Sequence, residues 1–333
     1  MAQNLRVTPH FAYPGMVLDQ VVQTGAHFLL GGKTLEDKIP AAVKAVYVSR
    51  MRIATQARAS MNGYANLPGV DVVRSEMSTP VTSIRMRTGF TSSDETDASA
   101  AGYSLQEAHR LGARQGVALA MRNGLLYGFG DGGGLVNNAI QASLPPDQLN
   151  ATTVSTYDNG SLFFFMMQQI AARKVATNQT MTPGLRVVVC APQRFIAHIT
   201  GQAIVQTVAI QRQGAGTGNV ATLLDDNMRL NDGAIEFVID DSLQNAGGAG
   251  IDYVMISIPE VKTQVIAGGL DVNAFGTLAP NLASSNIMLT RNMVPTEYIT
   301  PNENGGMNTM YESFCTSGWA IRPEATVRIS MPY

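Results

Sequence analysis

SLQEAHRLGARQGVALAMRNGLLYGFGDGGG, residues 104–134, combines a long helical pattern with a run of glycines. Ser104 and Glu107 have the spacing of a capping box, in which each side chain satisfies a free backbone donor at the start of a helix. Apolar residues then recur at helical intervals, so we predict one helix over residues 104–127. At about 1.5 Å per residue this helix is roughly 36 Å long, the length of a whole domain.

The side chains of this helix divide into two sets, which predict how it is oriented. We expect the apolar set to face the core and the charged set to lie off that stripe. The apolar set is Leu105, Ala108, Leu111, Ala118, Leu119, Leu125 and Leu126, and the charged set is Glu107, Arg110, Arg114 and Arg122.

The glycines after the helix have the G-x-G-x-x-G spacing of a dinucleotide-binding turn, at Gly128, Gly130 and Gly133. Such a turn follows a strand and opens a helix, because the pyrophosphate binds at the helix N-terminus. Here the glycines follow a helix, so we interpret them as its stop and a change of chain direction. A nucleotide-dependent enzyme that uses Gly128–Gly133 is kept as an alternative hypothesis.

The segment before the helix has the pattern of a projecting structure. Residues 50–91 predict a long antiparallel hairpin, because residues 70–74 are rich in β-branched side chains and residues 81–87 alternate between apolar and polar. The first 45 or so residues lack sustained periodicity and read as an extended arm, with a short helix near residues 41–48.

The segment after the glycines mixes helix and strand patterns and places the chain in the α+β class. We expect helices over residues 161–177 and 192–200, a buried strand over residues 185–191, short strands between residues 219 and 265, and a closing strand at the end.

Composition argues for a protein that associates with other chains. Charged residues make up 14% of the sequence, against about 25% in ordinary globular proteins. Surfaces buried between subunits are depleted in Lys, Glu and Asp, so low charge favours extensive contact with other chains over an ordinary low-charge domain. The net charge of −2 argues against a dedicated nucleic-acid binder. We see no signal segment or membrane span, and two cysteines indicate a reducing cytoplasm.

No group of residues has the spacing of a catalytic, cofactor-binding or metal site, so we expect a protein that is not an enzyme. The four histidines do not form an H-E-x-x-H motif, and Cys190 lies in the predicted buried strand, where desolvation keeps a thiol protonated. The acidic residues between 225 and 241 lack the spacing of a calcium loop. The histidines are His10, His27, His109 and His198.

Charge is divided unevenly along the chain. Residues 50–90 contain six arginines against Asp71 and Glu76, a balance of +4, while residues 219–260 contain eight acids against Arg229, a balance of −7. Opposite charges on one chain suit head-to-tail contacts between copies, although two independently solvated faces are an equal alternative. The candidate contacts between subunits are Arg58, Arg74, Arg85 and Arg87 on one side and Asp225, Asp226, Asp240 and Asp241 on the other.

The order of these elements resembles the HK97-fold major capsid proteins of tailed bacteriophages. The local likenesses are YANLPGVDVVRSEMSTPVTSIRMRTGFT (64–91), GDGGGLVNNA (130–139), LRVVVCAPQRFIAHI (185–199) and SGWAIRPEATVRISMPY (317–333). The resemblance implies five segments: an N-terminal arm (1–48), a β-hairpin called the E-loop (49–97), a P-domain (98–190) with its spine helix (104–127), an A-domain (191–310), and a strand that returns to the P-domain (311–333).

The resemblance implies a structural protein that assembles into pentamers and hexamers of an icosahedral shell around phage double-stranded DNA. The implied partners are other copies of the chain, a portal protein, separate scaffolding or decoration proteins, and DNA by non-specific proximity, with no cofactor and no membrane. The implied location is the virion capsid, assembled in the bacterial host cytoplasm. Within the same fold, an encapsulin-type nanocompartment shell is the alternative.

Two departures from the family sharpen this expectation. Some members crosslink through an E-loop lysine, but no lysine occurs between Arg50 and Asp97, so we expect no crosslinking of this type. Some members carry a scaffolding extension of about a hundred residues before the arm, and the short arm here implies a separate scaffolding protein or none. The five lysines are Lys33, Lys38, Lys44, Lys174 and Lys262.

Overall fold

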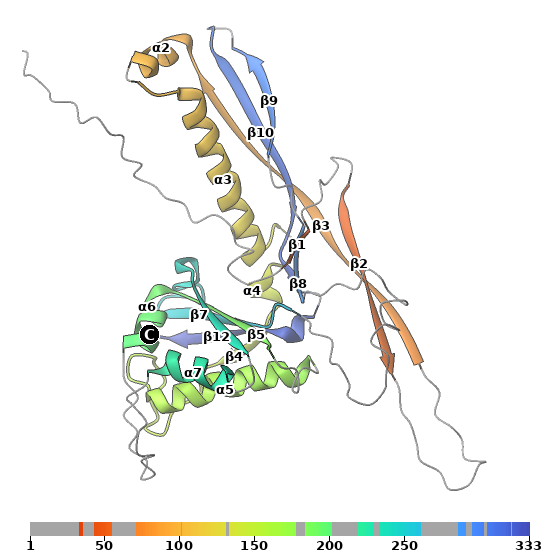
Figure 1. The fold of residues 1–333 in the computed structure, drawn as a ribbon, viewed down its shortest axis with the longest axis vertical. Coiled ribbons are helices and arrows are strands. Elements are labelled where there is room, and N and C mark those ends of the chain that lie inside the picture. Colours follow the sequence, from red (N-terminus) through yellow and green to blue (C-terminus); the bar gives the residue numbers. More distant parts are fainter. Residues whose placement is uncertain are drawn as a thin grey trace, which may run out of the picture.

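The computed structural model shows an elongated molecule built around one long helix (Figure 1). Long strands run beside helix α3, a mixed α/β layer lies at its C-terminal end, and the β2–β3 hairpin projects away from both. The structure describes residues 33–35, 43–54, 71–100, 102–130, 133–177, 184–201, 219–229, 233–260, 286–290, 295–302, 305–320 and 322–333. Most of the expected N-terminal arm lies outside these residues.

Helix α3 (Leu105–Tyr127) confirms the predicted helix and one half of its capping box. The Ser104 hydroxyl accepts a hydrogen bond from the Glu107 backbone N–H at 3.4 Å. The Glu107 carboxylate turns instead to Arg110, 2.5 Å from its Nη1. The cap is therefore carried by Ser104, and Glu107 joins an ion pair on the helix surface.

The predicted orientation of α3 is confirmed at its C-terminal end, where Leu125 and Leu126 are buried, but is wrong over the rest of the helix. Leu111 is 46% exposed and Leu119 39% exposed, and the buried stripe runs through Ala113, Val117, Met121 and Leu125. This stripe follows the four-residue interval of a helix face. Because Ala and Gly make other faces of the helix apolar as well, the sequence pattern alone did not distinguish the packed face.

Strand β3 (Asp71–Phe90) is a single 20-residue strand, where the sequence suggested two short ones. Its first half pairs antiparallel with β2 (Ala45–Ala54), and its second half with β10 (Met307–Thr316). Strand β9 (Thr296–Pro301) completes the sheet, whose order is β2-β3-β10-β9. The helix expected near residues 41–48 is wrong, because strand β2 begins at Ala45, and Val46, Tyr47 and Val48 all favour a strand.

Helix α3 packs on one face of this sheet. Val117 and Met121 form a small core with Cys315 of β10, against which Ile84 of β3 packs. Gly116 makes the close approach feasible, since a Cβ there would lie 2.8 Å from the sulfur of Met86. The helix and the long strands thus pack into one unit.

The second layer is a five-stranded sheet of order β4-β12-β7-β5-β6. Strand β5 (Arg186–Ala191) pairs parallel with β6 (Ala234–Ile239) and antiparallel with β7 (Ile251–Ser257). Strand β12 (Thr326–Pro332) pairs antiparallel with β7 and parallel with β4 (Ile140–Ser143). The mixed directions agree with the expected α+β class.

Helices cover both faces of the five-stranded sheet. Val187 and Val189 of β5 join a core with α5 (Asn159–Ala176), α6 (Gln193–Gly201) and α7 (Val220–Arg229). Cys190 points to the other face, where Leu125 of α3 and Leu135 of α4 (Leu135–Asn138) pack against it. Alternate residues of one strand therefore anchor the spine on one side and the helical layer on the other.

Sheet membership differs from the expected segment boundaries. Strand β4, helix α5 and strand β5 fall within the expected P-domain (98–190), yet they build the five-stranded sheet layer. Within residues 311–333, only β10 returns to the long strands, whereas β12 lies inside the five-stranded sheet. These pairings join residues far apart in sequence, which no local pattern encodes.

Shorter elements complete the described fold. Helix α2 (Ser92–Ala100) connects β3 to α3. Strands β1 (Lys33–Leu35), β8 (Ile287–Thr290) and β11 (Trp319–Ala320) form a three-stranded sheet. Two 3₁₀ turns cover Asp241–Leu243 and Pro323–Ala325.

Candidate functional site

The glycine segment ends α3 and turns the chain, as the sequence predicted. Gly128 caps the helix through a hydrogen bond from its N–H to the Gly124 carbonyl at 3.0 Å, and its φ of 86° lies in the region that favours glycine. A Cβ on Gly134 would lie 2.3 Å from the Leu126 carbonyl oxygen. The Asn138 amide donates to the Gly133 carbonyl at 2.8 Å. The segment binds the chain's own backbone.

The alternative interpretation of Gly128–Gly133 as a dinucleotide-binding turn is wrong. That turn needs a preceding strand and a following helix of useful length. Here the glycines follow α3, and the next helix, α4, has four residues.

The remaining side chains that could take part in catalysis or metal binding are buried or lie far apart. Burial raises the pKa of the Cys190 thiol to about 12, so this cysteine is protonated at any physiological pH. Among the residues that the structure describes, no three His, Cys, Asp or Glu side chains come together as a metal site.

A buried ion pair fastens α3 to the five-stranded sheet layer. Arg122 of α3 pairs with Asp240, which follows β6, and their side chains are 12% and 0% exposed. Nearby, the Tyr127 hydroxyl donates to the Ser242 carbonyl at 2.7 Å. Burial raises the pKa of Tyr127, so its hydroxyl stays protonated as a donor. The long helix and the sheet layer therefore share one polar junction.

This pair corrects one of the expected contacts between subunits. Asp240 is fully buried inside the subunit, so its carboxylate has no exposed surface to offer a neighbouring copy. The sequence pattern did not predict the burial of Asp240, because nothing in it distinguishes this residue from the other acids between residues 225 and 241. The indication of a buried ion pair in the sequence was Arg122, a charged residue in the mostly apolar C-terminal half of the predicted helix.

The other expected acidic contacts lie on the surface. Asp225 pairs with Arg229 at 2.8 Å within α7, and Asp226 is exposed. Asp241 accepts a hydrogen bond from the Gln193 backbone N–H at 2.9 Å. These three acids lie near α7 and α6 and are open to a partner.

The expected basic contacts are already partly engaged within the subunit. Arg85 is 64% exposed but bonds Glu312 of β10 at 2.7 Å, which lowers the pKa of that carboxyl. Arg74 pairs with Glu76 at 3.0 Å on the exposed hairpin. Arg87 is exposed and makes no ion pair among the described residues, and Arg58 lies outside them.

The sheet face away from α3 carries an uncovered row of side chains. Met86 points to α3, so its neighbour Arg87 points to the opposite face. Met310 and Tyr298 lie in register beside Arg87 on β10 and β9, and both are exposed. Exposed apolar side chains on a sheet near its edge strand are typical of an association surface.

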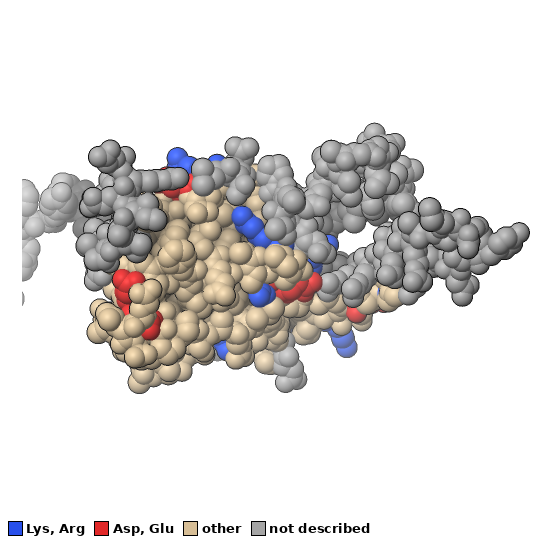
Figure 2. Space-filling view, turned by 90° about the horizontal axis from the view of Figure 1, so that it is seen from below, with Lys and Arg blue, Asp and Glu red and all other residues tan. Residues whose placement is uncertain are grey.

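One further face of the molecule is poor in charge. Figure 2 views the molecule from below, and the described residues on this face are mostly uncharged, with a few scattered Asp, Glu, Lys and Arg side chains. A surface of this kind matches the low charged fraction of the sequence and suits contact with other proteins.

Comparison with solved structures gives the same architecture over almost the whole chain. No protein-family model matches the chain, and no curated protein matches it either. The capsid of Myoviridae phage XM1 is similar with a TM-score of 0.67 and 11% identity, covering 97% of this chain and 96% of that one.

Two further structures support this likeness. Mycobacterium phage Che8 matches with a TM-score of 0.55 and 13% identity, covering 98% of this chain and 97% of that one. The capsid of a native GTA particle matches with a TM-score of 0.57 and 8% identity, covering 100% of this chain and 98% of that one. The chain has the HK97-like capsid fold, as its element order suggested.

None of the helices within the described ranges is both long and apolar enough to cross a membrane.

Proposed function

We propose that this chain is the major subunit of an icosahedral shell that encloses the double-stranded DNA of a tailed bacteriophage. The observation that carries the proposal is the end-to-end likeness to capsid structures, which leaves almost no part of either chain unmatched. A shared fold alone does not set function. The surface and the shape of this chain supply independent support.

The physical properties of the subunit suit self-assembly. The hairpin and the uncovered sheet face expose backbone edges and apolar side chains that a free monomer would normally protect. The described residues also lack a catalytic constellation around Gly128–Gly133. The exposed hairpin and sheet face support the proposal of a structural role in pentamers and hexamers of identical subunits.

The proposed partners are other copies of the chain, a portal protein at one vertex, and separate scaffolding or decoration proteins. DNA is a partner by proximity alone, since the net charge is −2. We place the subunit in the virion capsid, with assembly in the bacterial host cytoplasm.

Negative-stain electron microscopy of the purified full chain tests the proposal. We expect hollow shells, tubes or rings of five and six subunits. A species that stays monomeric at high concentration would contradict a shell function. Particles that contain enzyme cargo instead of DNA, when purified from the native source, would assign the chain to encapsulin-type compartments.

The proposed charged contacts between subunits are the exposed Arg87, Asp226 and Asp241 and the partly buried Asp225, together with Arg58, Arg74 and Arg85. Arg87→Glu is the sharpest variant, because Arg87 has no ion pair to lose within the described part of its own chain. We expect fewer particles and an unchanged far-UV circular dichroism spectrum. A normal particle yield would remove Arg87 from the contact set.

A further inference from the structure

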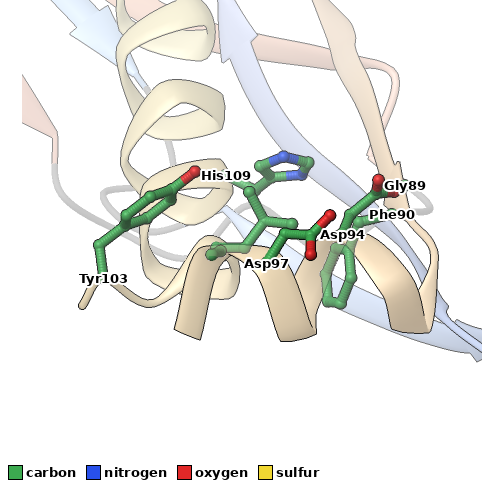
Figure 3. Close-up of a pocket in the computed structure, with 8 residues that line it drawn as sticks. Gly89, Phe90, Asp94, Asp97, Tyr103 and His109 are labelled. Atoms are coloured by element: carbon green, nitrogen blue, oxygen red, sulfur yellow. The ribbon is translucent and has the colours of Figure 1, made fainter. Parts of the chain in front are cut away.

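A pocket of about 370 Å³ opens where β3, α2 and α3 meet (Figure 3). Phe90 comes from the end of β3, Asp94 and Asp97 from α2, and Tyr103 and His109 from the segment that starts α3. Protein interiors are close-packed, with few voids larger than a water molecule. Open space of this size therefore means that α2 does not pack closely against both of its neighbours.

Helix α2 buries almost none of its surface. Eight of its nine residues are exposed, and Ala98, at 2% exposure, is the one that is buried. Its sequence, SSDETDASA, contains no apolar side chain larger than that of alanine. Helices in proteins are stabilised mainly by the packing of an apolar face, and α2 has no such face.

The helix is also too short and too polar to be stable by itself. Isolated helices shorter than about 12–15 residues are marginal in water, because the first turn is costly to form. Six of the nine residues are Ser, Thr or Asp, which favour a helix less than Ala does. Asp97 adds a negative charge in the last turn, which contains no basic residue, and the helix dipole disfavours a negative charge there.

Local hydrogen bonds close both ends of α2. The backbone N–H and the hydroxyl of Thr91 donate to Asp94 Oδ2 at 2.9 and 2.8 Å, and the Asp94 N–H donates to the Thr91 hydroxyl at 3.4 Å. These bonds lower the pKa of Asp94. At the other end, the N–H groups of Gly102 and Tyr103 donate to carbonyls of the last turn at 3.0 and 3.1 Å. Because every one of these bonds is local, they break together when the helix unwinds.

The contact between β3 and α3 does not depend on α2. Phe90, which is 6% exposed, meets the His109 ring edge-on, with ring centroids 5.6 Å apart. Further along the same two elements, Met86 lies beside Gly116. These residues precede and follow α2 in the sequence, so β3 stays attached to α3 when α2 unwinds.

Unwinding of α2 lengthens the connection between β3 and α3. The nine residues of α2 span about 14 Å as a helix and about 30 Å as an extended chain, so unwinding releases roughly 16 Å. Slack of this length lets the end of the strand and the start of the helix shift relative to each other, and the pocket leaves room for such a shift.

We propose that α2 is a strap, a short connection that unwinds and refolds locally in the free subunit and so lets β3 and α3 adjust to each other. Segments of low local stability are where proteins accommodate such changes. The inference rests on the proposed function, because a subunit that occupies both pentamers and hexamers meets neighbours in more than one arrangement.

Hydrogen–deuterium exchange of the unassembled full chain tests the strap. We expect the backbone amides of residues 95–100 to exchange at most about thirtyfold more slowly than in an unstructured peptide, which corresponds to an opening free energy of about 2 kcal/mol. Amides around Val117 and Met121, on the buried face of α3, should exchange at least about a hundredfold more slowly than those of α2. Protection of α2 equal to that of α3 would overturn the proposal.

Variants with altered helix propensity show whether unwinding of α2 controls this exchange. Thr96→Ala/Ser99→Ala changes two exposed positions and should slow exchange across α2 by about fivefold, because Ala favours a helix more than Thr or Ser does. Ala98→Gly should speed exchange towards the rate of an unstructured peptide. Gly112→Ala, on the exposed face of α3, is the matched control and should leave α2 unchanged. Unchanged exchange in both α2 variants would contradict the proposal.

A chemical bridge across α2 tests what the strap does in assembly. Ser92→Cys/Thr96→Cys places two exposed thiols at i and i+4, where a short bis-alkylating reagent holds the helix wound, and the native cysteines are buried. We expect the bridged subunit to form at least about threefold fewer particles than the same variant treated with a monofunctional reagent. Equal particle yields would remove the strap from assembly.

The two measurements separate this inference from the proposed function. A wild-type chain that never assembles would contradict the shell function, whereas exchange in the free subunit would still decide whether α2 opens.

Discussion

At the scale of single residues, the buried pair of Arg122 and Asp240 has the largest expected energetic effect. Breaking a buried ion pair by removing one partner leaves an uncompensated charge, which is destabilising by about 3–5 kcal/mol. Asp240 is completely buried and Arg122 nearly so, which places them in that class. Their pairing adds a polar contact between two layers that Leu125 and Leu126 of α3 also join by apolar packing.

We expect Arg122→Met to lower the free energy of unfolding of the unassembled subunit by about 3–5 kcal/mol. The double variant Arg122→Met/Asp240→Asn should recover much of this loss, since it leaves no buried charge. Chemical denaturation measures both. Asp226→Asn is the control on an exposed acid and should change stability by less than about 0.5 kcal/mol. Equal losses in the single and double variants would contradict the explanation.

The glycines give a matched pair of substitutions. In Gly134→Ala the new Cβ would meet backbone atoms of Leu126 and Gly128 at 2.3–2.4 Å, and backbone cannot move aside as a side chain can. We expect a clear fall in melting temperature and loss of soluble protein. Gly112→Ala, on the exposed face of α3 with nothing within 4 Å, should stabilise the helix by up to about 1 kcal/mol. Equal effects of the two variants would refute the close-approach argument.

At the scale of elements, Glu312 links β10 to β3. Its carboxyl is nearly buried, and its hydrogen bond from Arg85 lowers its pKa below the ordinary value of 4.5. A carboxyl whose pKa is lower in the folded state than in the unfolded chain stabilises the fold at pH values above its unfolded-state pKa. This stabilisation is lost as the pH falls through its folded-state pKa.

We expect the free energy of unfolding of the unassembled subunit to decrease as the pH is lowered below about 5. The variant Glu312→Gln should reduce that pH dependence. Glu76→Gln on the exposed hairpin should leave the slope unchanged, since exposed pairs contribute little. Melting temperatures recorded from pH 7 to pH 3 decide the question. Identical slopes in the wild type and Glu312→Gln would contradict this role.

Local patterns predicted the elements that are stabilised locally. Helix α3 has Ser104 as its cap, α5 has Asp158, and β5 is a continuous apolar run, so each was recognised within about two residues. Helix α2 was missed, although Thr91 and Asp94 exchange hydrogen bonds as a capping box. The same holds for α7, whose Asn219 side chain caps the backbone N–H of Thr222.

The candidate site was harder to predict, because its parts come from separate segments. The placement of β12 in the five-stranded sheet, and of Asp240 against α3, depends on pairings across more than a hundred residues. Composition and element order gave the class of fold, whereas individual contacts required coordinates.

At the scale of the whole molecule, the lysine distribution makes a prediction about the finished particle. No lysine lies between Arg50 and Asp97, so the hairpin region offers no amine for an amide crosslink. We expect mature particles to give a single subunit band on a denaturing, reducing gel. A ladder of covalent oligomers would show that a lysine outside this region is used, or that the chain crosslinks by other chemistry.

The continuity of β3 has a mechanical consequence. The strand is roughly 66 Å long if fully extended, with its first half in the projecting hairpin and its second half clamped by β10 and α3. A pull on the hairpin acts along the strand, so the ladder of hydrogen bonds to β10 is loaded in shear and its members must yield together. Tension on one subunit of an assembly would therefore be transmitted along β3 to its neighbours. Pressure from inside a closed shell would then be distributed over many subunits.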